Sequence, residues 1–381
     1  MKIIFICGCL EPGKDGVGDY ARKLGGELIR RGHQISLIAL YDKYIQQTQE
    51  IDQESEGMAI SVLRLERKLQ TKKRISKAKN KIVQFDPNWV SLQYVPTSFH
   101  SKGLNLKFPF LVTQLKGEFR WHLMIHEPWL VSYRKMSKES FVGMLQRGLL
   151  KLLIYKIGPR IIHTSNMFYQ EILEKGGVYS RLLHLPGNIP VIERIEQEII
   201  KEFVELGINK NSRKDWVVLG TFGKMRANID YLALLRTLLE RTDLQGKKIA
   251  FFSIGKAGIH CDEIFRSIEQ NYKENLLVHK FGERTTDEIS SFFQLLDYGV
   301  TSVPEHLLGK SGAYAAMRNH GLKILVPERK VVQGEIEMKN YSSNLFTLED
   351  KEFSSEKVVQ YFLCSLNGKS DIIFDVKPVR Q

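Results

Sequence analysis

With 381 residues, of which 43% are apolar, the chain is long enough for two globular cores, and its composition excludes a disordered or collagen-like protein. No apolar run is long enough to span a bilayer, and the run at residues 3–10 leads into Glu11-Pro12-Gly13, which predicts a buried first strand rather than a signal peptide. The four cysteines are not spaced for disulfides and indicate a reducing compartment, so we expect a cytoplasmic protein.

The net charge of +13 lies in the first half, because residues 1–190 hold 29 lysines and arginines against 16 aspartates and glutamates. The densest basic stretch, residues 64–81, has apolar residues at about helical spacing and predicts an amphipathic helix with a cationic outer face. Two interpretations of that face stay open. It is either a solvated surface or a surface attracted to an anionic membrane, where each basic side chain contributes about 1 kcal/mol. We see no zinc-finger spacing and no aromatic-basic RNA motif, so nucleic acid is not an expected partner.

Strands and helices are predicted to alternate along the first half. The expected strands are residues 2–9, 34–40, 90–95, 123–126 and 160–164, and the expected helices are 20–31, 149–157 and 166–175. The strand–helix–strand opening is typical of a parallel sheet covered by helices. Residues 186–190, bracketed by two prolines, predict a hinge.

A second alternating series follows the hinge. Its expected strands are residues 216–220, 248–254, 276–279, 298–303 and 323–326, and its expected helices are 228–241, 261–269, 286–296 and 312–320. We therefore predict an α/β protein of two Rossmann-like, doubly wound domains. In such domains ligands bind beyond the carboxyl ends of the strands, so the loops at those ends are the candidate sites.

The segment Lys310-Ser311-Gly312-Ala313 follows an expected strand and opens an expected helix. A helix start offers free backbone N–H groups, Lys310 adds a full positive charge, and the small residues let a large anion come close. This pattern predicts a cradle for a diphosphate. The alternative is a helix capped by Ser311 with tight Gly-Ala packing.

The first loop, residues 11–20, carries three glycines ahead of a helix but lacks the dinucleotide GxGxxG spacing. Gly16 and Gly18 permit close backbone approach, and Asp19 is the expected helix cap. The run Gly16-Val17-Gly18-Asp19-Tyr20, with residues 31–35, strongly resembles the opening of glycosyltransferase family 4, whose members are retaining, nucleotide-sugar-dependent enzymes of GT-B fold.

Three further stretches resemble the same family. Residues 86–96 are similar to the segment that leads into its acceptor-side loop, residues 125–129 to the strand end with its active-site histidine, and residues 310–321 to its donor-phosphate motif. The resemblance spans roughly residues 1–330. It implies an acceptor-binding domain at 1–190, a helical linker region at 191–214, a nucleotide-sugar domain at 215–355, and a C-terminal segment at 356–381 that packs back on the first domain.

The resemblance also assigns site residues. The catalytic candidates are His126, Glu127 and Glu305. The donor or phosphate candidates are Gly223, Lys224, Arg226, Gly282, Glu283, Lys310, Ser311 and Gly312. The acceptor-side candidates are Gly16, Val17, Gly18, Asp19, Tyr94 and His100.

The sequence departs from the family beside the donor. Many members carry two glutamates eight residues apart, whereas Glu305 is followed at that spacing by Ala313. The basic pair after the first strand of the second domain is compressed to Lys224 and Arg226. Since no Asp-x-Asp occurs, we expect no metal and no cofactor, with basic residues and N–H donors stabilising the diphosphate leaving group.

The expected activity is transfer of a sugar from a nucleotide-diphosphate donor to a glycan or lipid-linked acceptor, with retention, at the inner face of the cell membrane. Two alternatives stay open. One is a nucleotide-sugar epimerase on the same fold, and the other is a non-catalytic nucleotide-binding protein, which the missing glutamate suggests.

Overall fold

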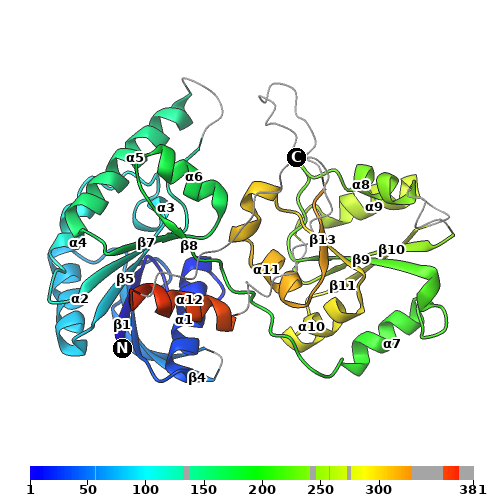
Figure 1. The fold of residues 1–381 in the computed structure, drawn as a ribbon, viewed down its shortest axis with the longest axis horizontal. Helices are drawn as coiled ribbons and strands as arrows, with labels where there is room; N and C mark the ends of the chain where they lie inside the picture. Colours follow the sequence, from blue (N-terminus) through cyan, green and yellow to red (C-terminus); the bar gives the residue numbers. More distant parts are fainter. Residues whose placement is uncertain are drawn as a thin grey trace. The chain divides into compact units, whose positions relative to one another are not determined.

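The computed structural model describes residues 1–55, 57–131, 137–240, 246–256, 258–272, 276–327 and 355–368. The chain divides into two compact units: unit 1 is Met1–His184 with the chain from Ser355 onward, and unit 2 is Leu185–Ser354. In each unit, helices cover a largely parallel sheet (Figure 1). Among the described residues, no helix has both the length and the apolar character needed to cross a bilayer.

Unit 1 is built on an eight-stranded sheet in the order β3-β4-β2-β1-β5-β6-β7-β8. Only the outer pair, β3 with β4, is antiparallel. The strands are β1 (Lys2–Cys7), β2 (Gln34–Asp42), β3 (Gln49–Ser55), β4 (Met58–Glu66), β5 (Trp89–Tyr94), β6 (Arg120–Ile125), β7 (Ile161–Thr164) and β8 (Arg181–Leu182).

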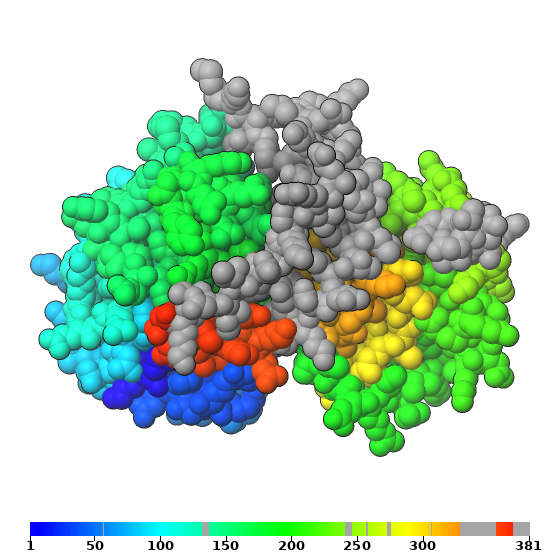
Figure 2. Space-filling model, in the orientation of Figure 1, coloured from blue at the N-terminus to red at the C-terminus, as the bar shows by residue number. Residues whose placement is uncertain are grey.

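Helices cover both faces of this sheet. They are α1 (Gly16–Arg30), α2 (Thr71–Phe85), α3 (Pro96–Phe99), α4 (Phe108–Thr113), α5 (Lys138–Ile157), α6 (Met167–Lys175) and α12 (Ser355–Leu366). Helices α2, α4, α5 and α6 share one core with Ile4 and Ile6 of β1. Because side chains alternate along a strand, Phe5 faces the other side, where its ring stacks on Phe362 of α12 at 5.9 Å. Helix α12, red in Figure 2, therefore lies beside α1 on the second face.

Unit 2 has a five-stranded sheet in the order β11-β10-β9-β12-β13, and every pair in it is parallel. Its strands are β9 (Trp216–Phe222), β10 (Lys248–Ile254), β11 (Leu276–Gly282), β12 (Tyr298–Val300) and β13 (Lys323–Leu325). Its helices are α7 (Gln197–Glu205), η1 (Arg213–Asp215), α8 (Tyr231–Leu239), α9 (Cys261–Asn271), α10 (Thr286–Leu295), η3 (Glu305–Lys310) and α11 (Gly312–Asn319). Every one of its β–α alternations follows the order predicted from the sequence.

The basic stretch differs from its prediction. The helix expected at residues 64–81 begins only at Thr71, because the residues up to Glu66 form β4 and pair with β2 and β3. Arg64 is therefore a buried strand residue. Arg74 is buried as well, with its guanidinium carbon 4.1 Å from the centre of the Tyr41 ring. Part of the positive charge thus lies inside unit 1 rather than on a solvated helix face.

The division between the units falls after His184, just before the expected hinge at residues 186–190. Gly187 lies against α11 so closely that a Cβ there would be 2.9 Å from the Cα of Ala316. Ile189 is buried in the core of unit 2, and α7 adds Ile199 and Phe203 to that core. The expected hinge and the region 191–214 therefore pack as parts of unit 2.

Helix α12 belongs to unit 1 although the whole of unit 2 precedes it in the sequence. The backbone carbonyl of Glu356 accepts a hydrogen bond from the Arg31 guanidinium at 3.1 Å. Residues 369–381 of the expected C-terminal segment lie outside the described residues.

Candidate functional site

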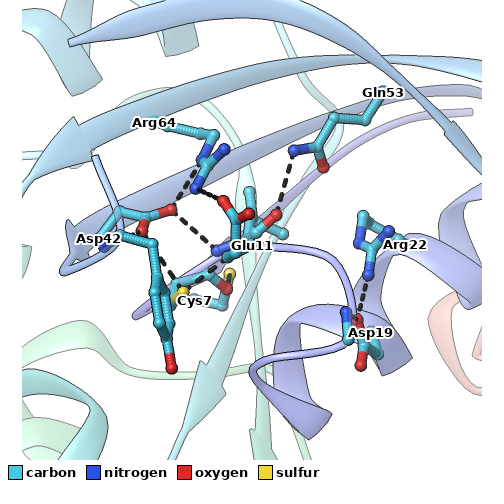
Figure 3. A network of polar contacts seen from close by, with 11 residues as sticks. Cys7, Glu11, Asp19, Arg22, Asp42, Gln53 and Arg64 are labelled. Atoms are coloured by element: carbon cyan, nitrogen blue, oxygen red, sulfur yellow. Dashed lines mark hydrogen bonds and ion pairs between the residues drawn. The ribbon is translucent and has the colours of Figure 1, made fainter. Parts of the chain in front are cut away.

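The glycine-bearing loop of unit 1 ends in a well-capped helix. The carboxylate of Asp15 accepts hydrogen bonds from the backbone N–H groups of Val17 and Gly18, so α1 begins at Gly16. The prediction that Asp19 caps this helix was wrong. Asp19 lies inside the first turn and pairs with the guanidinium of Arg22 (Figure 3).

Two of the three loop glycines, Gly16 and Gly18, differ in their surroundings. A Cβ on Gly18 would lie 2.4 Å from the carbonyl oxygen of Cys9, so this glycine is required for the close approach of α1 to the loop. A Cβ on Gly16 would meet nothing within 4 Å, and Gly16 is exposed. At the start of α1, Gly16 therefore leaves open space for a ligand, whereas Gly18 does not.

A buried ionic network fixes the other end of the loop (Figure 3). Asp42, at the end of β2, is buried and accepts hydrogen bonds from Arg64 Nε at 2.8 Å and from the backbone N–H of Leu10 at 3.1 Å. Arg64 also pairs with Glu11. From β3, the side-chain amide of Gln53 donates to the Leu10 carbonyl at 3.0 Å. The loop that resembles the glycosyltransferase opening is thus held from three strands.

The electrostatics of this network favour a charged Asp42. Burial by itself would raise the pKa of Asp42, but hydrogen bonds from Arg64 and from the N–H groups of Tyr44 and Leu10 bring that pKa below its ordinary value. The aspartate stays ionised at neutral pH.

His126 lies directly after β6, at the carboxyl edge of the same sheet. Its ring packs edge-on against Tyr20 of α1, with 4.9 Å between ring centres. Burial lowers the pKa of His126 to about 3, so the imidazole is neutral at physiological pH. The Tyr20 hydroxyl is buried and has no hydrogen-bond partner among the described residues. An unpartnered buried hydroxyl is costly, and it marks this corner as a place where a polar ligand atom would be stabilised.

The other unit 1 candidates take different positions. Glu127 follows His126 and is half-buried. Tyr94 is buried in the core on the opposite face of the sheet, where its ring stacks on Phe99. His100 Nδ1 accepts hydrogen bonds from the backbone N–H groups of Lys102 and Leu104, both at 3.2 Å. The structure gives Tyr94 and His100 packing and loop-closing roles and does not bring their side chains to His126.

In unit 2, three glycines end adjacent strands. Gly223 follows β9, Gly255 follows β10, and Gly282 ends β11, with positive φ angles of 76°, 82° and 71°. The N–H of Gly223 donates to the Ile254 carbonyl at 2.9 Å, and that of Gly255 donates to the Gly282 carbonyl at 2.7 Å. A Cβ on Gly223 or Gly282 would meet nothing within 4 Å. This row leaves open backbone at the carboxyl edge, which is where doubly wound sheets bind nucleotides.

Two basic side chains lie next to Gly223, the first glycine of this row. Lys224 and Arg226 are exposed and flank Met225, which is fully buried. The loop after β12 contacts the loop that carries these two residues, since the Ser302 hydroxyl donates to the Lys224 carbonyl at 2.7 Å. The fold therefore brings two basic side chains to the open edge of the sheet, as their positions after the first strand of this unit predicted.

The Lys310 segment has the predicted local structure. Ser311 caps α11 by accepting a hydrogen bond from the N–H of Tyr314 at 3.2 Å, and Gly312 opens the helix. Lys310 ends η3, which begins at Glu305. Burial raises the pKa of Glu305.

The remaining donor candidate, Glu283, is exposed immediately after Gly282. Its neighbour Arg284 is held by Glu202 at 2.7 Å. The loop after β11 is thereby anchored to α7 within unit 2.

Sequence reasoning missed several polar residues inside buried strands. Gln93 and Ser91 of β5 and His122 of β6 are nearly fully buried and connect to His126 through hydrogen bonds. The signal was present in the sequence as polar side chains inside apolar runs at residues 89–95 and 120–126. For Tyr20 the sequence offered no signal beyond its place in the run at residues 16–20.

Comparison with known structures places the fold. The chain is similar to Anabaena Alr3699/HepE in complex with UDP, with a TM-score of 0.53, 12% identity, and coverage of 86% of this chain and 80% of that one. It is also similar to a glycosyltransferase from Rickettsia africae, with a TM-score of 0.51, 10% identity, and coverage of 85% and 78%. No protein-family model matches the sequence, and no curated protein sequence does. The chain has the same two-unit fold as these solved structures, the GT-B fold of two Rossmann-like units that the sequence predicted.

Proposed function

We propose that this protein is a glycosyltransferase that uses a nucleotide-diphosphate sugar and passes the sugar to a glycan or lipid-linked acceptor. The observation that carries the proposal is the open edge of unit 2, where Gly223 and Gly282 leave bare backbone beside exposed Lys224 and Arg226. The likeness of the fold to HepE, which was solved with UDP, supports a nucleotide as the ligand.

The chemistry follows from charge. Breaking the bond between the sugar and the diphosphate builds negative charge on the leaving group, and fixed cations and N–H donors stabilise that charge. Lys224 and Arg226 supply the cations in this proposal. The start of α11, capped by Ser311, supplies N–H groups and the positive end of a helix dipole. Lys310 comes directly before the capping residue Ser311 and adds its positive charge.

In unit 1 we assign the acceptor side. Neutral His126, the orphaned hydroxyl of Tyr20 and the open Gly16 are the groups that we expect to meet sugar or acceptor hydroxyls. Transfer with retention and without a metal ion is part of the proposal. It rests on the resemblance of residues 16–20 and 125–129 to glycosyltransferase family 4 and on the absence of Asp-x-Asp.

Donor binding is tested by thermal shift with a panel of nucleoside diphosphates. A ligand present at 100 times its dissociation constant raises the free energy of unfolding by about 2.7 kcal/mol. In the double variant Lys224→Ala/Arg226→Ala we expect the affinity to fall by about 100- to 10,000-fold, since each of the two charge-assisted contacts contributes about 1.5–3 kcal/mol. Lys323→Ala, an exposed lysine at the opposite end of the unit 2 sheet, is the matched control and should leave the affinity unchanged.

Turnover is tested with isotope-labelled nucleotide sugars and membranes, with and without EDTA. Release of nucleoside diphosphate that depends on an acceptor supports transfer. Conversion of the nucleotide sugar without an acceptor would indicate an epimerase. Tight binding of a nucleotide with no turnover of any donor would indicate a non-catalytic protein and sink the proposal.

We also propose that unit 1 docks on an anionic membrane, and we assign the contact to α5. Phe141, Met144 and Tyr155 are 59%, 60% and 80% exposed. These residues recur at spacings of three and eleven, which places them on one face of the helix. Arg147 and Lys151 on the same helix are also exposed. Exposed apolar side chains with cations among them favour attraction to an anionic lipid surface.

Vesicle co-sedimentation tests this contact. We expect binding to vesicles that contain an anionic phospholipid, weak binding to phosphatidylcholine alone, and loss of binding at 1 M salt. Phe141→Ser/Met144→Ser should weaken the binding. Val83→Ser on α2, which removes a side chain that is 67% exposed, is the control. Equal binding by both variants would exclude α5 as the contact.

A further inference from the structure

A continuous chain of hydrogen bonds runs through the interior of unit 1 behind His126. His126 Nε2 lies 2.9 Å from Gln93 Oε1, and Gln93 Nε2 donates to Ser91 Oγ at 2.7 Å. Ser91 Oγ lies 2.6 Å from His122 Nδ1, and His122 Nε2 lies 2.9 Å from His163 Nδ1. The chain ends at Ser365 of α12, whose hydroxyl lies 3.2 Å from His163 Nε2.

The chain crosses three strands on the face that α12 covers. Ser91 and Gln93 lie two residues apart on β5 and so share a face, and β6 and β7 place His122 and His163 next to them. The ring of Phe362 packs edge-on against His122 at 5.1 Å and excludes water. Burial lowers the pKa of His163 to about 3 and that of His122 well below its ordinary value, so both rings are neutral.

Because the histidines are neutral, each ring carries one proton, and the donor and acceptor roles along the chain depend on one another. The Gln93 amide turns its oxygen to His126 and its nitrogen to Ser91, so His126 must carry its proton on Nε2. The Ser91 hydroxyl accepts from Gln93 and therefore donates to His122 Nδ1. His122 and His163 then carry their protons on Nε2 as well. Turning the Gln93 amide around would require every bond to reverse together, so the members change orientation only as a set.

We propose that Gln93 is a positioning residue for His126, and that the hydrogen-bonded chain from Ser91 to Ser365 of α12 holds its amide in place. The chain fixes His126 as the Nε2–H tautomer and leaves a lone pair on Nδ1. No described residue hydrogen-bonds to that Nδ1. The role of this lone pair rests on the proposed function, in which it accepts a hydrogen bond from a sugar or acceptor hydroxyl.

The tautomers are measured directly by NMR of the imidazole nitrogens in protein labelled with ¹⁵N-histidine, since a protonated and a bare ring nitrogen differ widely in chemical shift. In the wild-type protein at pH 7 we expect His122, His126 and His163 each to be protonated on Nε2 alone. Gln93→Met removes both amide bonds at nearly constant volume, and His126 should then show shifts of a tautomer mixture. Ser91→Ala should loosen the amide and shift His126 in the same direction by less.

Gln146→Met is the matched control. Gln146 is a buried glutamine of α5 whose amide bonds go to backbone atoms of Leu130 and Lys102, outside the chain. It should lower stability as Gln93→Met does and leave the His126 shifts unchanged. In a transferase assay we expect Gln93→Met to lower kcat about 10- to 100-fold, as loss of an orienting partner typically does, with the KM of the donor little changed.

The NMR result stands whether or not sugar transfer is found, so failure of the proposed function and failure of this inference are distinguishable. Wild-type histidines that do not share one orientation would overturn the inference. So would a His126 signal that is the same in Gln93→Met as in the wild type.

Discussion

The two units share a plan of parallel strands and covering helices but differ at the carboxyl edges of their sheets. In unit 1 this edge is closed by internal pairing, with Asp42, Arg64 and Glu11 holding the first loop and a hydrogen-bonded chain behind His126. In unit 2 the edge is open, with bare glycine backbone and the exposed cations Lys224 and Arg226. The difference teaches that unit 1 fixes the geometry of its edge by internal pairing, whereas unit 2 leaves charge and space at its edge, where we propose that an anion binds.

The largest expected difference between the two units is in their stability at low pH. The pKa values of His126 and His163 are about 3 in the folded state, against about 6.5 when unfolded, and that of His122 is also far below its ordinary value. The unfolded chain therefore takes up protons as the pH falls below 6.5 while the folded unit does not, so stability is full above pH 6.5 and falls towards pH 3. At pH 5 His126 and His163 each contribute a loss of about 2 kcal/mol, and His122 adds to the loss in the same direction.

Hydrogen exchange at pH 7 and pH 5 measures this effect separately in each unit, which matters because two units need not unfold together. Corrected for the intrinsic exchange rates, the amides of β5–β7 should lose more protection than those of β9 and β10. His163→Phe should reduce the loss in unit 1. Equal losses in the two units would contradict the prediction.

The ionic network of unit 1 comes next. Arg64→Met leaves Asp42 buried without its cation, and breaking such a buried pair costs about 3–5 kcal/mol in the free energy of unfolding. Denaturant unfolding followed by a unit 1 probe measures it. The double variant Asp42→Asn/Arg64→Met should recover part of the loss. Lys81→Met, which breaks the partly exposed pair with Glu50, should cost less than about 1 kcal/mol.

Gly16 and Gly18 of the first loop allow a comparison of an open position with a closely packed one within unit 1. Gly18→Ala would push a Cβ against the Cys9 carbonyl, and we expect a loss of about 1–3 kcal/mol. Gly16→Ala meets open space and should be neutral or stabilise by about 0.4–1 kcal/mol. Thermal unfolding gives both values. A loss of turnover in Gly16→Ala without loss of stability would support a ligand at Gly16, and similar stabilities for the two variants would contradict the close approach at Gly18.

The smallest effect is expected at the open edge of unit 2. Ser311→Ala removes the cap of α11 and should lower stability by about 1 kcal/mol. Ser311→Asp keeps a capping oxygen but adds a negative charge where the diphosphate is proposed to bind. It should preserve stability and weaken nucleotide binding in isothermal titration. Unchanged nucleotide affinity in Ser311→Asp would separate the α11 start from the donor site.

Much of the fold was predictable because the signals are local. The alternation of strands and helices at residues 2–42 and 216–325 follows from hydrophobic periodicity, and the structure has the order that the periodicity predicted. The errors are also local. Asp15 rather than Asp19 caps α1, since a cap needs its side chain two or three residues before the N–H groups that it accepts from. The helix predicted at residues 64–81 began too early, because the residues up to Glu66 belong to β4, and only pairing with β2 decided the matter.

The candidate sites were predictable only in part. The positions of Lys224 and Ser311 follow from where a strand ends and a helix begins, so the sequence located them without any tertiary contact. The partners of Asp42 lie 22 and 32 residues away, and no local pattern connects them. Tyr94 was an acceptor candidate, but strand alternation turned its side chain to the core while His126 faces the other side of the sheet.

The sequence by itself determined the two α/β series, the first-half location of the net positive charge, the capped start of α11 and the lack of an Asp-x-Asp pair. These depend on backbone preferences and on side chains a few residues apart. Only the tertiary structure decided that Arg64 is a buried ion-pair partner and that Ser365 ends a chain of bonds starting at His126. Ser365 and its partner His163 are separated by 202 positions in the sequence. The physical reason is that such contacts are set by the register of paired strands and by where a helix returns to pack, and neither is encoded within one turn or one strand.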